Sequence, residues 1–318
     1  MWDFPLLPEA ASSTAAEVDA LFWILIGVAS VFGGIITAGL VYFNIRYRKN
    51  SKASRAGAVS EHLPLELLWS IVPLVISAGI FGWGAKLYFD MHVPPENARE
   101  VYVVGKQWMW KIQHPQGNRE INELHVPVGV PIKLVMTSQD VIHSFFVPAF
   151  RIKQDVLPGR YTTTWFEATK PGEYHLFCAE YCGTSHASMK GRVVVMKQEE
   201  FERWLAGNRQ EESMTASGDQ LFRQFGCVTC HSQTSQERGP SLHGLFGSTV
   251  RLADGSTVTA DERYIRESIL NPGAALVAGY KPLMPTYAGQ MSQEQLFQII
   301  EYVKSLGGPQ IAGERRNP

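Results

Sequence analysis

The chain has 318 residues, of which 45% are hydrophobic and 19% charged, and its formal net charge is −1 at pH 7. This length suffices for two domains or more, and the near-neutral charge gives no reason to expect nucleic acid as a partner. A mean hydropathy of −0.08 argues against a protein made mainly of membrane spans, but it allows a few spans attached to a polar domain.

Two runs without charged residues lie near the N-terminus, from Ala20 to Phe43 and from Leu67 to Ala85. Both approach or exceed the roughly 20 residues that a helix needs to cross a bilayer, and two buried core helices would fit such lengths poorly. The runs predict an N-terminal external segment over 1–19 and a transmembrane hairpin over 20–90, with helices at about 20–43 and 65–88.

The segment between the two runs carries the basic residues Arg46, Arg48, Lys49, Lys52 and Arg55. The positive-inside rule places this short loop in the cytoplasm, so both termini and everything after about residue 90 are expected outside. The segment before the first run has acidic charges only, which is not the flank of a signal peptide; whether an earlier signal was removed stays open.

Residues 91–206 alternate apolar and polar side chains in short runs separated by turn residues, which favours a β-sandwich or barrel. Expected strands include 101–104, 132–136, 161–166 and 193–196. Trp108 and Trp110 are two residues apart, so on one strand they would share a face. Either tryptophan alone would also suit an ordinary core.

Soft metal ligands are concentrated in a short stretch that contains Cys178, Cys182, His186 and Met189. Thiolate and thioether ligands favour copper, and two thiolates can bridge two copper ions. His143, at the expected end of a strand, is the best second histidine. A local disulfide or a zinc site is the alternative, but the disulfide leaves His186 and Met189 without a role, and zinc leaves Met189 without one.

The stretch Cys178-Ala-Glu-Tyr-Cys182-Gly-Thr-Ser-His186-Ala-Ser-Met189 resembles the copper-A loop of cytochrome c oxidase subunit II. His143 precedes Cys178 by 35 residues, which is the spacing found in that family. The resemblance implies a cupredoxin-like fold for 91–206. It also implies one copper ion on His143, Cys178, Cys182 and Met189, and a second on His186, both cysteines and the backbone carbonyl of Glu180.

The same resemblance assigns roles to three further residues. Trp108 would take electrons from the donor, and the Glu180 carboxylate would bind a magnesium or manganese ion shared with subunit I. The stretch Glu66-Leu-Leu-Trp-Ser-Ile-Val-Pro73 is similar to a family segment whose glutamate lies near the entrance of a proton path. The alternative for Glu66 is an interfacial carboxylate in the first turn of a helix.

A polar segment over 207–216 is expected to be a linker to a second domain. A helix is expected to start at Ser217, with Gln220 completing a capping box. The motif that follows, Cys227-Val-Thr-Cys230-His231, is a signature of covalent haem c attachment. A redox C-x-x-C or half of a zinc site would need a βαβ pattern or a second C-x-x-C, and the sequence shows neither.

The sixth haem ligand should be a downstream Met or His. We expect Met284, because the prolines on both sides of it can fix a loop that presents its sulfur; His243 and Met291 are the alternatives. A last helix with its N-cap at Ser292 completes the pattern of an all-α class I cytochrome c domain over 217–310.

The parts together resemble subunit II of a caa-type haem-copper oxidase with a cytochrome c domain fused at its C-terminus, and the resemblance implies a place in a bacterial plasma membrane. Its expected partners are subunit I, subunit III and a cytochrome c donor. The alternatives are the electron-input subunit of a copper-A nitric oxide reductase and a non-catalytic copper-binding assembly protein.

Overall fold

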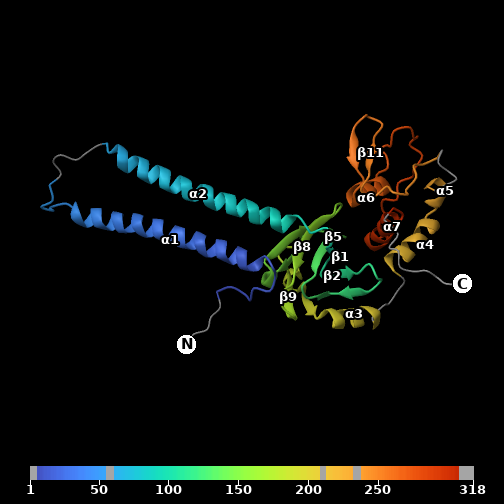
Figure 1. The fold of residues 1–318 in the computed structure, drawn as a ribbon, viewed down its shortest axis with the longest axis horizontal. Coiled ribbons are helices and arrows are strands. Elements are labelled where there is room, and N and C mark those ends of the chain that lie inside the picture. The colour runs from blue at the N-terminus through green and yellow to red at the C-terminus, as the bar shows by residue number, and fades with distance from the viewer. Residues whose placement is uncertain (1–5, 55–60, 208–212, 232–237, 308–318) are drawn as a thin grey trace.

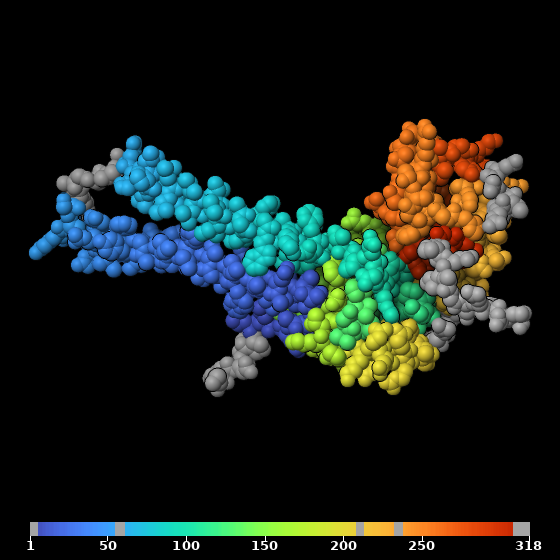
Figure 2. Space-filling model, in the orientation of Figure 1, coloured from blue at the N-terminus to red at the C-terminus, as the bar shows by residue number. Residues whose placement is uncertain are grey.

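The computed structural model describes residues 6–54, 61–207, 213–231 and 238–307 (Figure 1). It confirms the expected combination of a two-helix hairpin, a β-sandwich and a small helical domain. The hairpin projects from one end of the molecule, and the helical domain packs on the opposite side of the sandwich (Figure 2).

The hairpin consists of α1 (Ala15–Arg46) and α2 (Leu63–His92). Both helices extend beyond the charge-free runs at each end. Their most apolar windows have mean hydropathies of 2.3 and 1.8, and none of those residues is buried. Exposed apolar surface on this scale is unfavourable in water, whereas helices of this length and composition suit a bilayer.

Two contacts fasten the hairpin to the sandwich. Arg151 binds Asp19 of α1 through two hydrogen bonds of 2.7 and 2.9 Å, and a bidentate pair of this kind fixes orientation as well as distance. The indole N–H of Trp165 donates to the carbonyl of Asp90 in α2 over 3.1 Å. The sandwich is therefore fixed near the N-terminal end of α1 and the C-terminal end of α2.

The sandwich is built from two five-stranded sheets, with the orders β3-β2-β1-β5-β8 and β4-β10-β9-β6-β7. Its strands in chain order are β1 (Arg99–Lys106), β2 (Met109–Gln113), β3 (Arg119–Ile121), β4 (Glu123–Pro127), β5 (Pro131–Ser138), β6 (His143–Val147), β7 (Ile152–Val156), β8 (Thr162–Glu167), β9 (Gly172–Cys178) and β10 (Lys190–Met196). The short helices η1 (Pro148–Phe150) and η2 (His186–Ser188) lie in two of the loops.

Strand β1 is buried on both of its faces. Val101 and Val103 point into the core between the two sheets, whereas Tyr102 and Val104 belong to a separate buried cluster with Phe297 of the C-terminal domain. Because successive side chains of a strand point to opposite faces, this pattern means that the C-terminal domain covers the outer face of the sheet.

Helix α3 (Gln198–Gly207) follows the last strand of the sandwich. The C-terminal domain then contains α4 (Met214–Gln224), α5 (Val228–His231), β11 (Thr249–Arg251), β12 (Thr257–Thr259), α6 (Glu262–Leu270) and α7 (Gln293–Ser305). Helices α4 and α7 cross so closely at Gly218 that an added Cβ would lie 2.1 Å from the carbonyl oxygen of Gln298. Ser292 caps α7, as the sequence predicts, and the structure adds a capping box with Gln295.

Two local predictions are wrong. Helix α4 begins at Met214 rather than at Ser217, because Ser213 caps it by accepting from the N–H of Ala216; the end of the expected linker is therefore helical. Trp108 does not share a strand with Trp110, since it lies in the turn between β1 and β2. The remaining linker residues, 208–212, and residues 308–310 lie outside the described residues.

Candidate copper and haem centres

The residues predicted to bind copper converge at one end of the second sheet. His143 is the first residue of β6, Cys178 is the last residue of β9, and the loop 179–189 joins β9 to β10. These strands are direct neighbours, with Phe145 paired with Cys178 and Phe177 paired with Lys190. The sheet therefore places an isolated histidine and a long loop side by side, although 35 residues separate His143 from Cys178.

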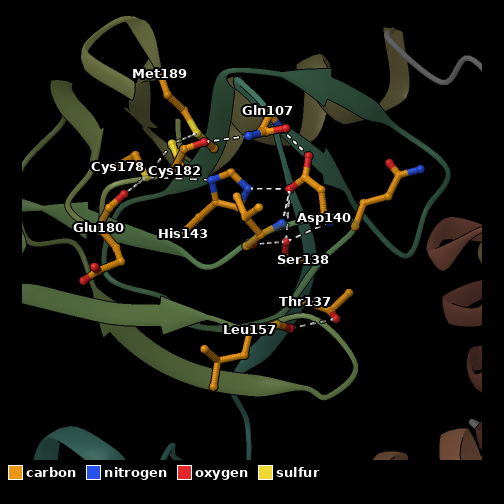
Figure 3. A network of polar contacts seen from close by, with 12 residues as sticks. Gln107, Thr137, Ser138, Asp140, His143, Leu157, Cys178, Glu180, Cys182 and Met189 are labelled. Atoms are coloured by element: carbon orange, nitrogen blue, oxygen red, sulfur yellow. Dashed lines mark hydrogen bonds and ion pairs between the residues drawn. The ribbon is translucent and has the colours of Figure 1, made fainter. Parts of the chain in front are cut away.

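The six predicted ligand groups form one connected cluster around the two cysteine sulfurs. Figure 3 labels five of them: His143, Cys178, Glu180, Cys182 and Met189. The two cysteine sulfurs are 3.7 Å apart. Cys178 Sγ lies 3.9 Å from His143 Nδ1 and 3.3 Å from the carbonyl oxygen of Glu180. Cys182 Sγ lies 3.4 Å from His186 Nδ1 and 3.8 Å from Met189 Sδ.

The thiols of the pair differ in acidity. Burial acts to raise the pKa of Cys178, but hydrogen bonds with His143 and with backbone groups lower it below the ordinary value. The pKa of Cys182 is raised by burial and by the adjacent Cys178 sulfur. Two buried thiols so close together do not both ionise readily on their own, whereas bound metal ions hold both as thiolates.

The donor chemistry fits the copper pair that the sequence suggests. Both cysteines are free thiols, and His143, Cys182 and Met189 are each at most 2% exposed. A disulfide would leave the converging imidazoles and thioether unexplained, and zinc would leave the thioether unexplained. Two thiolates, two imidazoles, one thioether and one carbonyl form a soft and borderline ligand set suited to copper.

The orientation of His143 is set by Asp140. The carboxylate Oδ1 of Asp140 lies 2.8 Å from His143 Nε2, and a carboxylate can only accept here, so Nε2 carries the proton and Nδ1 is free for a metal. Asp140 is itself held by backbone N–H groups of Gln107 and Val141, each over 2.7 Å. Burial acts to raise the pKa of Asp140, but these donors and His143 lower it.

Trp108 lies against the loop 179–189, which carries Cys182. An added Cβ on Gly183 would meet Trp108 Cζ2 at 3.3 Å and Gln107 Nε2 at 2.9 Å, and Gly183 has a φ of +119°. Gln107 also donates from Nε2 to the carbonyl of Cys182 over 2.8 Å. The turn between β1 and β2 therefore packs directly on the loop that carries the two cysteines.

The C-terminal domain encloses a cavity of about 540 Å³ that is lined by Cys227, Cys230, His231 and Met284 together with apolar side chains. His231 Nδ1 lies 2.9 Å from the carbonyl oxygen of Pro240. Since a carbonyl only accepts, Nδ1 donates and Nε2 is left to bind iron. The motif, the apolar lining and the available imidazole nitrogen fit covalent haem c.

The three candidates for the sixth haem ligand are placed differently. Met284 lines the cavity, whereas His243 and Met291 are not among its lining residues. Met291 packs in the surrounding apolar cluster, and His243 Nδ1 lies 3.2 Å from the carbonyl oxygen of Leu306. The cavity therefore favours Met284.

Two other predicted residues have less distinctive surroundings. Glu66 lies in the first turn of α2, where its carboxylate accepts from the N–H of His62 over 3.1 Å. The Glu180 side chain is exposed, and within the described ranges its carboxylate joins no group of potential metal ligands. A magnesium or manganese ion at Glu180 would need its other ligands from water or from another subunit.

A second cluster of ligand-type side chains contains Glu120, Glu123 and His125. The carboxylate of Glu120 already pairs with His125, and with His114 over 2.9 Å. Glu123 pairs with Arg192 over 2.5 Å. Mutual hydrogen bonding accounts for these groups, so we interpret the cluster as structural.

Sequence reasoning missed Asp140 and Gln107. Asp140 precedes His143 by three residues, and that spacing was the available signal for a carboxylate behind the imidazole. Gln107 gave no signal, because its contact with Cys182 depends on how the turn after β1 packs.

Comparison with known proteins agrees with this arrangement. Family models described as the transmembrane domain and the periplasmic domain of cytochrome c oxidase subunit II match residues 1–80 and 118–197. A model described as cytochrome c matches residues 215–307.

Relatives of known identity are similar over most of their length. Cytochrome c oxidase subunit 2 of Thermostichus vulcanus is 32% identical over 64% of this chain and 79% of its own. The corresponding protein of Alkalihalophilus pseudofirmus is 32% identical over 76% of this chain and 73% of its own. The crystal structure of the periplasmic domain of subunit II of the Bradyrhizobium japonicum oxidase covers 37% of this chain and 98% of its own, with 33% identity and a TM-score of 0.36. The chain belongs to the cytochrome c oxidase subunit II family, as a two-pass membrane protein that also carries a C-terminal cytochrome c domain.

Proposed function

We propose that this chain is the electron-input subunit of a terminal respiratory cytochrome c oxidase of the caa type. It accepts electrons from a cytochrome c through haem c and binuclear copper A, and passes them to the dioxygen-reducing haem and copper centre of subunit I. One observation supports the proposal: a cluster of all the residues expected to bind copper A and a cavity with the haem c motif occur in the same chain.

When bound, the copper pair and the haem each take up and release one electron at a time. The residues of the chain supply rigidity around them. His143, Cys178, Cys182, His186, Met189 and the Glu180 carbonyl would hold the copper pair. Cys227 and Cys230 would attach the haem covalently, and His231 and Met284 would bind its iron.

Asp140 and the sheet ends keep the copper ligands in place, so little rearrangement is needed when the charge of the site changes. Trp108, packed on Gly183, is in a suitable position to take electrons from an external donor. Glu66 would lie near the entrance of the proton path into subunit I, which performs the oxygen chemistry and the proton translocation of the complex.

The basic loop between α1 and α2 would face the cytoplasm of a bacterium, with both termini and the copper and haem domains on the periplasmic side. Subunit I would pack against the exposed hairpin, with subunit III as a further membrane partner. The Glu180 carboxylate would contribute to a magnesium or manganese site shared with subunit I.

Oxygen uptake by the purified complex, driven by reduced cytochrome c, tests the proposal. Cys182→Ser should abolish uptake while haem c is still reduced by the donor, and Thr184→Ala, in an exposed part of the same loop, should leave uptake unchanged. Wild-type uptake by Cys182→Ser would contradict the proposal. Nitric oxide consumption in place of oxygen uptake would favour a reductase, and copper that is not reduced through the haem would favour an assembly protein.

A further inference from the structure

The haem domain and the copper domain share a buried core of their own. Tyr102 of β1 and Phe297 of α7 are each 1% exposed, with ring centroids 4.6 Å apart. Tyr161, just before β8, also stacks on Phe297, with ring centroids 4.9 Å apart. Met214, the first residue of α4, is fully buried in the same cluster. Domains joined only by a flexible tether do not exclude water from a common apolar cluster in this way.

Beside this core lies a group of charged residues that we call the clamp: Glu100, Lys133, Glu262, Glu301 and Lys304. Glu100 and Lys133 come from the sandwich, and the other three from α6 and α7. Each clamp side chain is only 14–22% exposed, so solvent screens these charges less than it screens surface pairs.

The clamp interleaves charges from the two domains. Lys304 of the haem domain pairs with Glu100 of the sandwich, as well as with Glu262 at 3.3 Å and Glu301 at 2.8 Å. Lys133 of the sandwich pairs with Glu100 at 2.8 Å and reaches Glu262 across the interface at 3.7 Å. Separating the domains would therefore break the ion pair of Lys304 with Glu100 and that of Lys133 with Glu262.

Two further contacts lie away from the clamp. Lys111 of β2 binds Glu294, at the start of α7, over 2.7 Å. Arg266 of α6 is only 5% exposed and donates from Nη1 to the carbonyl oxygen of Gly159 in the sandwich. Contacts at both ends of α7 and on α6 define an orientation, whereas a single contact would define only proximity.

In this orientation a single helix, α6, separates the haem cavity from the copper domain. Helix α6 lines the cavity with Ile265 and Ile269, and it contacts the sandwich with Arg266 and Glu262. A helix with its side chains is about 10 Å across, so the cavity is that close to the copper domain.

The backbone that Arg266 contacts is joined to the copper centre. The carbonyl of Leu157, two residues before Gly159, accepts from the N–H of Ser138 over 3.1 Å, and Ser138 Oγ accepts from the N–H of Asp140 over 3.1 Å (Figure 3). Asp140 in turn orients His143. The docked face is therefore connected to the copper-type ligands by a short chain of hydrogen bonds.

We propose that the clamp and Arg266 hold the haem domain permanently docked on the outer face of β1, β2 and β5, so that the covalent linker is not what keeps the two domains together. A linker alone would give a high effective concentration without a fixed geometry. The docking does not depend on the electron-transfer function proposed above, although it would place the haem domain in a constant position for that function.

Cleavage of the full chain tests the docking. Residues 208–212 are replaced by a protease recognition site, the detergent-purified protein is cut, and the two fragments are run together on a sizing column. The C-terminal fragment should co-elute with the copper domain. Immediate dissociation of the cut wild-type fragments would overturn the proposal.

Lys304→Met should weaken retention of the fragment roughly a hundredfold or more, because it removes the cation that joins Glu100 to the haem domain, leaves Glu301 without that cation, and leaves Lys133 as the one clamp cation for Glu100 and Glu262. Arg223→Met is the matched control: it removes one positive charge from the same domain, at an exposed pair with Asp219 that lies outside the interface, and it should retain the fragment. Equal retention of the Lys304 and Arg223 variants would contradict the clamp.

If Lys304→Met disturbs the fold of the haem domain, Glu100→Gln decides the question, since it alters only the sandwich side. This variant should release an unaltered haem domain, and unchanged retention would overturn the proposal. The measurement requires neither copper nor electron transfer. Retained fragments without copper reduction would therefore contradict only the proposed function, and rapid reduction with dissociated fragments would contradict only the docking.

Discussion

The Asp140 carboxylate and the His143 imidazole form a hydrogen bond of 2.8 Å on the side of the ring that faces away from Cys178. The bond fixes the ring tautomer and directs Nδ1 at the cysteine sulfur. A carboxylate that accepts a hydrogen bond from a metal-binding histidine raises the basicity of the ligating nitrogen and fixes the orientation of the ring.

Removing this partner should weaken copper binding. We expect Asp140→Ala to lower the copper affinity of the site about 10–100-fold. Asp140→Asn, which keeps an acceptor but loses the charge, should fall between Asp140→Ala and the wild type. Competition with a copper chelator measures the affinity. Wild-type affinity in Asp140→Ala would show that the sheet alone positions His143.

A side chain at position 183 should disturb the loop on which Trp108 packs. In Gly183→Ala the new Cβ would lie 2.9 Å from Gln107 Nε2 in a backbone conformation with φ of +119°, which residues with a Cβ rarely adopt. We expect displacement of Gln107 and Trp108, an altered copper absorption spectrum and slower reduction by external cytochrome c.

Gly129 offers a control for that variant, because it also has a positive φ, of +70°, but has no atom within 4 Å of an added Cβ. Gly129→Ala should also place a Cβ at a positive φ, and it should leave the copper spectrum unchanged. If both variants keep the wild-type spectrum, the close packing of Gly183 has no influence on the site.

Replacing Met284 should change the axial ligation of the haem. The residue lines the same cavity as His231, whose Nδ1 is already engaged by the carbonyl of Pro240. Met284→Ala should remove the near-infrared charge-transfer band of methionine-ligated ferric haem and lower the haem potential, since Met/His ligation raises it. Met291→Ala should retain the band, and its loss in that variant instead would reverse the assignment.

The clamp should contribute to stability in a pH-dependent way. Burial acts to raise the pKa of Glu100, but Lys304 and Lys133 lower it from 4.5 to about 2. A lowered carboxylate pKa gives stability that is complete above about 4.5 and is lost as the pH falls toward 2. The difference corresponds to roughly 3 kcal/mol.

Thermal unfolding of wild type and Glu100→Gln at a series of pH values checks this. The wild type should unfold at the higher temperature at pH 6, and the two midpoints should converge as the pH approaches 2. A gap that stays constant over that range would mean that the Glu100 charge is not responsible.

The features that could be predicted from the sequence are those encoded locally. The two apolar runs, the cysteine motifs and the alternating strands each carry their signal within a few residues. The placement of His143 beside the loop could be expected only from the resemblance to the subunit II family, because the pairing of β6 with β9 is a long-range property of the sheet.

Other features depend on contacts that no local pattern contains. The clamp brings together residues 100, 133, 262, 301 and 304. The local sequence around each of them predicts only an ordinary charged side chain on the surface. The run Val101-Tyr-Val-Val104 is a partial exception, because a strand that is apolar without interruption is typically buried on both faces. The start of α4 was misplaced because Ser213 and Ser217 are both good N-caps, and burial of Met214 against the sandwich favours the earlier one.

The most direct test of the central claim is electron paramagnetic resonance of the copper-loaded full-length chain, with copper and haem quantified in the same sample. We expect two copper ions for each haem c, and a hyperfine pattern from one unpaired electron shared equally by two copper nuclei. Cys178→Ser should abolish that pattern. A signal from a single copper nucleus in the wild type, or a loop that binds no copper, would contradict the copper-A assignment and leave a membrane-anchored cytochrome c.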